Sequence, residues 1–177
     1  MTITTLVLTG AADSLPDFTF KTNSITGTRK SGEESRFNFS LPFVDGYLDA
    51  YDARLNGDLL CYADGVLLLE CNPDVLNYNV SAVNKNITIQ ATKHITNSNP
   101  TTHDFTGRIE RIRRGTDGKQ VFSVVGFSDI LPLDAIKFYS ADIGDSCYNI
   151  LEYRITINNS GYAFELVEDS VKNDCFS

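Results

Sequence analysis

Only two histidines are available for acid–base or nucleophilic chemistry in this chain of 177 residues, His94 and His103. Nucleophilic hydrolysis needs a serine or cysteine within reach of a histidine that a carboxylate orients. No G-x-S-x-G turn accompanies either histidine, and both border a segment rich in Asn, Thr and Ser, where a surface histidine needs no special role. We therefore predict no catalytic residue and no enzymatic activity.

The other reactive side chains form no cofactor or metal pattern. Neither of the glycine-rich phosphate-binding patterns, G-x-x-x-x-G-K-[ST] and G-x-G-x-x-G, occurs. Glu33 and Glu34 are typical of a solvated pair, although the sequence leaves open which carboxylates meet in space. Asp45, Asp49 and Asp52 lack the D-x-D-x-D-G alternation of a calcium loop. We predict no cofactor and no metal ion.

The four cysteines, Cys61, Cys71, Cys147 and Cys175, fit neither a C-x-x-C metal pair nor a compact disulfide framework. No Lys or Arg precedes Lys21, so the basic start of a signal peptide is missing, and no apolar run is long enough to span a membrane. We therefore expect folding in a cytoplasm, with four reduced and mostly buried thiols. A Cys61–Cys71 bridge stays open, because a three-residue hairpin loop would bring both cysteines to one face.

The net charge of −8 argues against binding to nucleic acids and to anionic membranes, which require a positive surface. Against this acidic background the segment GRIERIRRGTDGKQVFSVVG, residues 107–126, concentrates four arginines on one arm of a predicted hairpin. They are Arg108, Arg111, Arg113 and Arg114.

Strict alternation would place Arg111 and Arg113 on one face of this arm together with Ile109. Arg108 and Arg114 would share the other face with Glu110 and Ile112. The planar guanidinium of arginine suits a protein interface, where the side chain can meet an acidic patch on another copy. Charges on an exposed strand can equally serve to keep the edge from pairing. Both interpretations of the four arginines remain open.

The elements that must position these residues are predicted from alternating apolar and polar side chains, which indicate strands. Such patterns recur in residues 36–43, 57–71, 78–92, 107–126 and 151–168. The fold class we predict is all-β, an antiparallel β-barrel or β-sandwich of successive hairpins with little helix. The whole chain, 1–177, is predicted to be one domain, with a possible N-terminal hairpin subregion 1–45 packed on a barrel 55–168.

Three local features refine this prediction. Residues 17–26 should pair with the strand 36–43 across a charged loop, 27–35. Pro42 cannot donate a hydrogen bond to a neighbouring strand, so we expect the strand 36–43 at a sheet edge or a bulge. Only the segment 44–55 has the spacing of an amphipathic helix.

The segment TGRIERIRRGTDGKQVFSVVGFSDILPLDA, residues 106–135, combines a strand that starts Gly-x-Ile with a second strand ending in Gly and a region rich in Asp, Leu and Pro. In this it resembles the barrel of tail-hub and baseplate proteins of contractile and non-contractile bacteriophage tails. The matching positions are Gly107, Ile109, Val121, Val124, Gly126, Ser128, Asp129, Leu131 and Asp134. Gly57-Asp58 and Gly144-Asp145 match glycine–aspartate pairs of the family, so the resemblance covers roughly residues 55–168.

The resemblance implies a structural virion protein, a hub- or adaptor-type component of a tail or baseplate that is assembled in the cytoplasm of the host bacterium. Its partners would be itself, in a ring-type homo-oligomer, and other tail or baseplate proteins, with the four arginines at a subunit contact. Whether the N-terminal strand, residues 2–9, pairs within its own chain or with another copy stays open.

Two alternative functions remain. The first is a glycan-binding module of a tail fibre or an adhesin, with exposed tyrosines stacking on sugar rings. The tyrosines considered for this role are Tyr47, Tyr51, Tyr139 and Tyr148. The second alternative is a capsid decoration protein, which shares the acidic all-β character.

Overall fold

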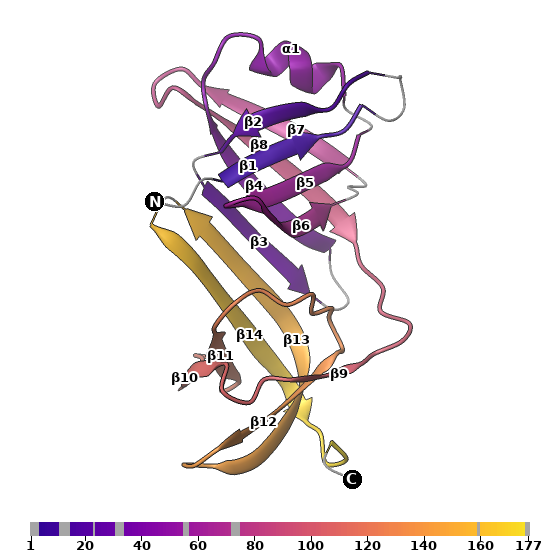
Figure 1. The fold of residues 1–177 in the computed structure, drawn as a ribbon, viewed down its shortest axis with the longest axis vertical. Coiled ribbons are helices and arrows are strands. Elements are labelled where there is room, and N and C mark those ends of the chain that lie inside the picture. Colours follow the sequence, from indigo (N-terminus) through magenta and orange to yellow (C-terminus); the bar gives the residue numbers. More distant parts are fainter. Residues whose placement is uncertain are drawn as a thin grey trace. The chain divides into compact units, whose positions relative to one another are not determined.

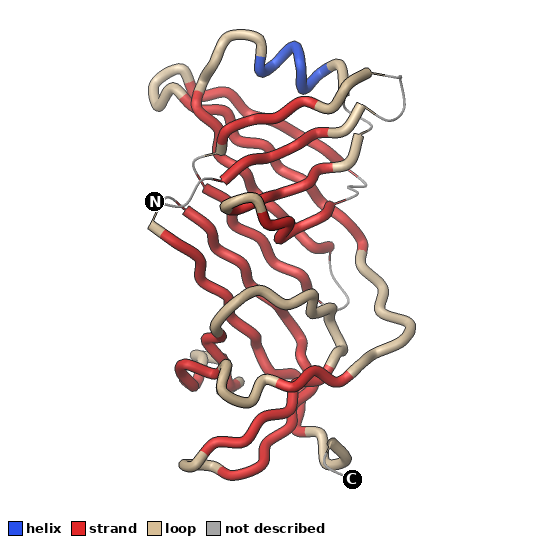
Figure 2. Tube along the Cα trace, in the orientation of Figure 1, coloured by secondary structure: helices blue, strands red, loops and turns tan. Residues whose placement is uncertain are grey.

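The computed structural model of the chain describes residues 4–10, 15–22, 24–30, 34–54, 57–71, 75–158 and 160–175 (Figure 1). Strands hold 61% of these residues and helix only 4%, so the predicted all-β class is confirmed. Figure 2 shows the strands in red and a short blue helix.

The chain divides into two compact units. The first comprises Met1–Gly27, Arg36–Lys93 and Thr156–Tyr162, and the second Thr28–Ser35, His94–Ile155 and Ala163–Ser177. Both units take residues from the segments 1–45 and 55–168.

A four-stranded antiparallel sheet in the first unit has the order β2-β1-β5-β6. Its strands are β1 (Thr4–Leu8), β2 (Phe18–Lys21), β5 (Leu59–Ala63) and β6 (Val66–Cys71). The N-terminal strand β1 pairs on both sides within its own chain. Between β5 and β6, Asp64 and Gly65 have φ of 49° and 81°, as the predicted tight hairpin turn requires.

A bulge after Cys61 shifts the pairing of β5 with β6, so that Cys61 lies opposite Leu69 and Leu59 opposite Cys71. Because of this shift, Cys61 and Cys71 share one face of the sheet, and both are buried thiols. Burial raises the pKa of Cys61 to about 12, so this thiol stays protonated.

The strand order β3-β4-β8-β7 also runs through the first unit. These strands are β3 (Ser24–Lys30), β4 (Glu34–Pro42), β7 (Val75–Ser81) and β8 (Asn86–His94). The apolar residues of β3, β4 and β8 alternate inward, and Gly27 leaves room for the Phe37 ring, which a Cβ at residue 27 would overlap. The buried apolar residues of the unit include Leu6, Leu8, Phe20, Ile25, Phe37, Phe39, Leu41, Leu59, Leu69, Ile87, Ile89 and Ile157.

Helix α1 (Tyr47–Asp52) lies within the segment 44–55 for which a helix was predicted. It buries Tyr51, whose ring meets that of Tyr78 at 5.1 Å, while Asp49 and Asp52 are exposed. The helix is therefore held by aromatic contacts on one face and solvated on the other.

The second unit has the strand order β10-β11-β14-β13, with β12 paired to β13 and β9 paired in parallel to β12. The bounds are β9 (Thr102–Asp104), β10 (Ile109–Arg114), β11 (Gln120–Val124), β12 (Ala135–Ser140), β13 (Gly144–Asn158) and β14 (Gly161–Val171). Phe122 packs against Phe138 and Tyr148, with ring centroids 5.7 and 5.0 Å away. Each such buried ring contributes roughly 1.5–3 kcal/mol of burial free energy.

The expected edge position of the strand 36–43 and the expected charged loop before it are both wrong. Strand β4 lies between β3 and β8, not at an edge. Pro42 is tolerated because it is the last residue of the strand, and the next N–H, that of Phe43, bonds the Lys85 carbonyl at 3.0 Å. The expected charged loop 27–35 is largely strand, since β3 extends to Lys30 and β4 begins at Glu34.

The expectation of four reduced thiols is also wrong. Cys147, in β13, and Cys175, near the C-terminus, form a disulfide. The backbone N–H of Lys172 donates to the Cys147 carbonyl at 3.0 Å, so the segment after β14 is held against β13 by a covalent and a hydrogen bond. The two cysteines are 28 residues apart, and no sequence spacing rule identifies such a distant pair.

Candidate functional site

The four arginines named from the sequence lie on or beside β10, the last strand in the order of the second unit. Arg111 and Arg114 are exposed, and neither makes a hydrogen bond or an ion pair with another residue in the described part of the chain. Arg108 and Arg113 are only partly exposed and both bond within the second unit. The structure therefore divides the set of four into two pairs.

A bulge changes the expected faces of this strand. Ile109 lies opposite Val124, but Arg111 lies opposite the adjacent Ser123, so Glu110 is the extra residue. The bulge places Ile109 on the face opposite to Arg111 and Arg113, which corrects the strict alternation expected from the sequence. Bulges are common where a sheet edge is kept from further pairing.

Arg113 forms an ion pair across the sheet. Its Nη2 lies 3.1 and 3.2 Å from the two carboxylate oxygens of Glu165 in β14. Arg154, in β13, pairs with Glu152 at 2.8 Å and approaches Glu165 at 3.9 Å. The charges on this face of the sheet are therefore largely matched within the chain.

Arg108 acts as a clamp on the chain that follows β11. Its guanidinium donates to the carbonyl oxygens of Val125 (3.1 Å), Gly126 (3.1 Å) and Phe127 (3.3 Å) and to the Ser128 hydroxyl (2.7 Å). It also stacks over the Phe105 ring, 4.4 Å from the centroid. With its donors used inside the chain, Arg108 organises a loop.

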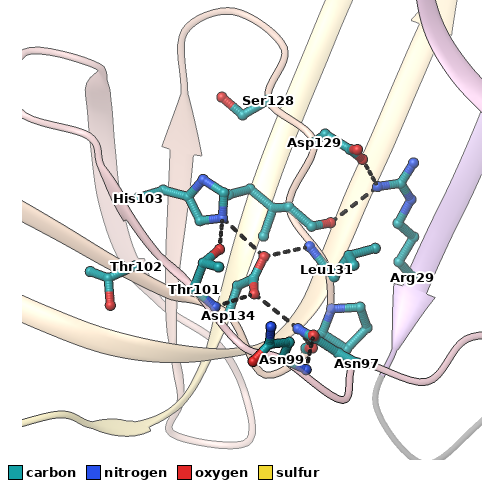
Figure 3. A network of polar contacts seen from close by, with 12 residues as sticks. Arg29, Asn97, Asn99, Thr101, Thr102, His103, Ser128, Asp129, Leu131 and Asp134 are labelled. Carbon is teal, nitrogen blue, oxygen red and sulfur yellow. Dashed lines mark hydrogen bonds and ion pairs between the residues drawn. The ribbon is translucent and has the colours of Figure 1, made fainter.

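Asp134 is the centre of a second polar network, at the other end of that loop (Figure 3). Asp134 is 3% exposed, and its carboxylate accepts hydrogen bonds from the backbone N–H groups of Thr101 (2.9 Å) and Leu131 (3.1 Å). The Asn97 side-chain amide and the His103 ring Nε2 also form hydrogen bonds with this carboxylate, each at 2.9 Å. These bonds join the segment before β9 to the turn before β12.

The ionisation of Asp134 follows from these contacts. Burial alone would raise its pKa, but the hydrogen bonds from Thr101, Leu131, Asn97 and His103 outweigh burial and lower the pKa below its usual value. Asp134 is therefore a buried carboxylate held in its charged form by four donors. Such a satisfied network rigidifies the loop that it closes.

Arg29, from β3, holds the middle of the same loop. Its side chain is 7% exposed, and Nη1 donates to Asp129 at 2.7 Å and to the Ile130 carbonyl at 3.1 Å. The loop 125–134 is thus fixed by Arg108, Arg29 and Asp134, although Leu133 within it has a φ of 73°. That left-handed conformation is unfavourable for leucine and is maintained by the surrounding bonds.

The contacts of His103 are not those of the histidine in a catalytic triad. Thr101 Oγ1 and Asp134 Oδ2 lie 3.0 and 2.9 Å from the same nitrogen of His103, Nε2. A relay from a hydroxyl through histidine to a carboxylate uses the two opposite ring nitrogens. In the described residues no three His, Cys, Asp or Glu side chains gather as metal ligands, and no helix is long and apolar enough to cross a membrane.

Sequence reasoning missed the roles of His103 and Arg29, which it treated as ordinary surface residues of polar segments. The available signal was Asp134 itself, a position of the bacteriophage pattern, because an aspartate directly before a strand often accepts hydrogen bonds from nearby backbone. Which distant residues supply the other donors depends on the fold.

The tyrosines considered for sugar stacking are mostly unsuitable. Tyr51 is 1% and Tyr148 8% exposed, so neither ring face can receive a ligand, and this expectation is wrong for both. Tyr139 is 59% exposed, and Tyr47 is partly exposed with its hydroxyl 3.3 Å from the backbone N of Lys21. Tyr47 and Tyr139 belong to different units, so neither unit by itself brings together two of these four tyrosines with exposed rings.

No protein-family model and no curated protein sequence matches the chain. Three solved structures are similar in fold. A tail protein from Neisseria meningitidis MC58 has a TM-score of 0.52 at 9% identity, covering 98% of this chain and 96% of its own. The 43 kDa tail protein of prophage MuSo2 from Shewanella oneidensis has a TM-score of 0.54 at 7% identity, covering 96% and 97%.

The third structure is the c3393 protein of Escherichia coli, described as a component of the type VI secretion system with structural similarity to the T4 bacteriophage tail proteins gp27 and gp5. It has a TM-score of 0.57 at 6% identity and covers 95% of this chain and 77% of that one. At such identities the likeness concerns the fold, and it agrees at that level with the resemblance stated from the sequence.

Proposed function

We propose that this chain is a structural component of a bacteriophage-type tail, acting by assembly with itself and with other tail proteins and without chemical turnover. The observation that carries the proposal is the fold likeness, which extends over 95–98% of the chain to three tail or tail-related proteins. Under this proposal the protein is located in the virion, after assembly in the bacterial cytoplasm. A hub or adaptor position within a ring is the finer form of the same proposal.

The arginine arm supports a contact with another subunit. Arg111 and Arg114 present exposed guanidinium groups, which no described residue of the chain engages, on an acidic protein. Guanidinium groups in this state suit an acidic patch on a neighbouring subunit, where each pair would direct orientation more than add affinity. We assign the assembly contact of the arm to these two residues, with Arg108 and Arg113 holding the arm in place.

Location in the particle is the direct test. Antibody raised against the chain and coupled to gold should label the tails of phage particles produced by the bacterium that encodes it, as seen by negative-stain electron microscopy. Labelling of capsids would instead indicate a decoration protein. Absence of the chain from purified particles would overturn the proposal.

The ring contact has a separate test, light scattering on the purified chain eluting from a sizing column. We expect a discrete trimer or hexamer, and a lower oligomeric state for the double variant Arg111→Glu/Arg114→Glu with an unchanged circular dichroism spectrum. The control Lys21→Glu/Arg36→Glu makes the same change in net charge on exposed residues of the first unit. Equal behaviour of both variants and the wild type would remove the assigned contact.

A further inference from the structure

Strand β7 ends the order β3-β4-β8-β7 in the first unit, so one of its long sides is not paired within the described chain. Its pairing with β8 is continuous from Val75, opposite Thr92, to Ser81, opposite Asn86. All four residues from Asn77 to Val80 are exposed. A regular strand with accessible backbone groups along one side is a template for another strand.

The strand lacks the features that normally protect such an edge. Its sequence, VLNYNVS, contains no charge and no proline, and its pairing with β8 shows no bulge. Unprotected edges of this kind associate with other strands unless something covers them.

The sequence of β7 also reads nearly the same in both directions about Tyr78. Asn77 and Asn79 flank it, and Leu76 and Val80 follow on either side. An antiparallel pair of identical strands centred on this tyrosine would place each asparagine opposite an asparagine, and each apolar position opposite an apolar position. We propose that β7 pairs antiparallel with β7 of a second copy of this chain, around a two-fold axis at Tyr78.

The apolar face of the strand supports this partner. Tyr78 and Val80 are 41% and 36% exposed, whereas Ile89 and Ile87, opposite them in β8, are 1% and 2% exposed. The apolar face of the sheet is therefore buried at β8 but exposed to solvent at β7, its last strand. A second β7 in the proposed register places another tyrosine opposite Tyr78 and a leucine, residue 76, opposite Val80, and so continues the burial.

The polar face supports the same partner. Asn77 and Asn79 line a shallow groove of about 470 Å³ with Thr88 and Gln90 of β8. None of these side chains bonds to another described residue. An amide carries both donors and an acceptor, so the amides of two copies can satisfy each other across the axis, as stacked asparagines do. A charged partner would find no matching charge in this groove.

The first measurement is the molecular mass of the wild-type chain by sedimentation from low to high micromolar concentration. Pairing through β7 predicts that the mass of the species present at low concentration doubles as the concentration rises. Amide hydrogen exchange in β7 should slow as the concentration rises, a readout that needs no variant. A mass that does not double as the concentration rises, or a β7 exchange rate independent of concentration, overturns the proposal.

Charged substitutions at Asn77 and Asn79 test the proposed register between the two copies of β7. In Asn77→Lys/Asn79→Lys each new lysine faces a lysine of the other copy, which should weaken pairing by roughly 100-fold or more. Asn77→Asp/Asn79→Asp should be equally defective alone, and an equal mixture of the two variants should associate again. Thr26→Lys adds the same charge at an exposed side chain of β3, three strands away from β7, and should leave pairing unchanged.

A mixture that stays dissociated, or lysine variants that associate like the wild type, overturns the register. These results are independent of the proposed tail function, because particle labelling and the arginine variants test other surfaces. Circular dichroism of each variant establishes that the sheet is intact before association is compared.

Discussion

Strands β10 and β7 each stand last in the strand order of their unit, yet their edges differ in nearly every respect. β10 carries Arg111, Arg113, Arg114 and Glu110 and is interrupted by a bulge, whereas β7 is uncharged and regular over its length. The charges and the bulge of the first edge disfavour pairing with another strand. The second can meet any strand that matches its alternation, and its own sequence provides such a match.

The edges of two sheets in one chain can therefore suit different kinds of contact. A charged and bulged edge resists accidental strand pairing and suits docking by ion pairs, which salt weakens. An uncharged regular edge suits backbone pairing, which salt affects much less. The residues that support the two edges also differ. β7 packs beside the buried apolar residues of β8, whereas the hairpin of β10 and β11 is followed by the loop 125–134, which buried hydrogen bonds hold in place.

The largest expected effect concerns the apolar support of β7. Ile89→Ala should lower the free energy of unfolding by about 2–5 kcal/mol, because it leaves a cavity beneath the hairpin. Urea unfolding followed by circular dichroism measures this loss. Val80→Ala, at the half-exposed edge, should cost much less, and equal costs for the two variants would mean that β7 is buried in the isolated chain.

The next effect concerns the polar support of the loop after β11. Asp134→Asn should lower the free energy of unfolding by roughly 1–3 kcal/mol, because buried donors lose a charged acceptor. Asp129→Asn, at a side chain that is 78% exposed, is the matched control and should cost less.

The pH dependence of the unfolding free energy of Asp134→Asn tests whether the charge of Asp134 stabilises the loop. Because the folded pKa of Asp134 is lowered, its contribution is fully present above the unfolded pKa of about 4 and is lost as the pH falls through the folded pKa. The stability difference between wild type and Asp134→Asn should therefore shrink in strong acid. A difference independent of pH would show that the charge of Asp134 is not what stabilises the loop.

The smallest effects separate the arginines of β10. Arg113→Gln should cost about 0.2–1 kcal/mol, the range for partly exposed ion pairs, and less at high salt. Arg111→Gln should change the unfolding free energy of the isolated chain by close to zero, since its guanidinium is exposed and makes no hydrogen bond or ion pair with a described residue. Similar costs for the two variants in urea titrations would contradict the division of the arginines into supporting and exposed pairs.

Much of the fold follows from the sequence because alternation and turn residues are local signals. The turn at Asp64-Gly65, the hairpin of β7 and β8 and the position of α1 all agree with it. The positions of bulges do not follow, because a single extra residue such as Glu110 is decided by the packing of both neighbouring strands. The place of β4 inside its sheet could not be derived from Pro42, since a terminal proline and an interior one look alike in sequence.

The candidate site was predictable only in part. The arginine cluster is visible in the sequence, but the separation of Arg108 from Arg111 depends on where residues 125–128 lie after folding. The network at Asp134 joins residues more than 30 positions apart, and no periodic pattern connects them.

The disulfide between Cys147 and Cys175 gives the chain two chemical forms with different unfolded states. Closing a loop across 28 residues removes conformations from the unfolded ensemble and is worth roughly 3–4 kcal/mol in the simplest polymer treatment. The reduced chain, as a ribosome delivers it, lacks that restriction, and the oxidised chain keeps it wherever it travels. Molecules of identical sequence therefore differ in their resistance to unfolding according to whether they have been oxidised.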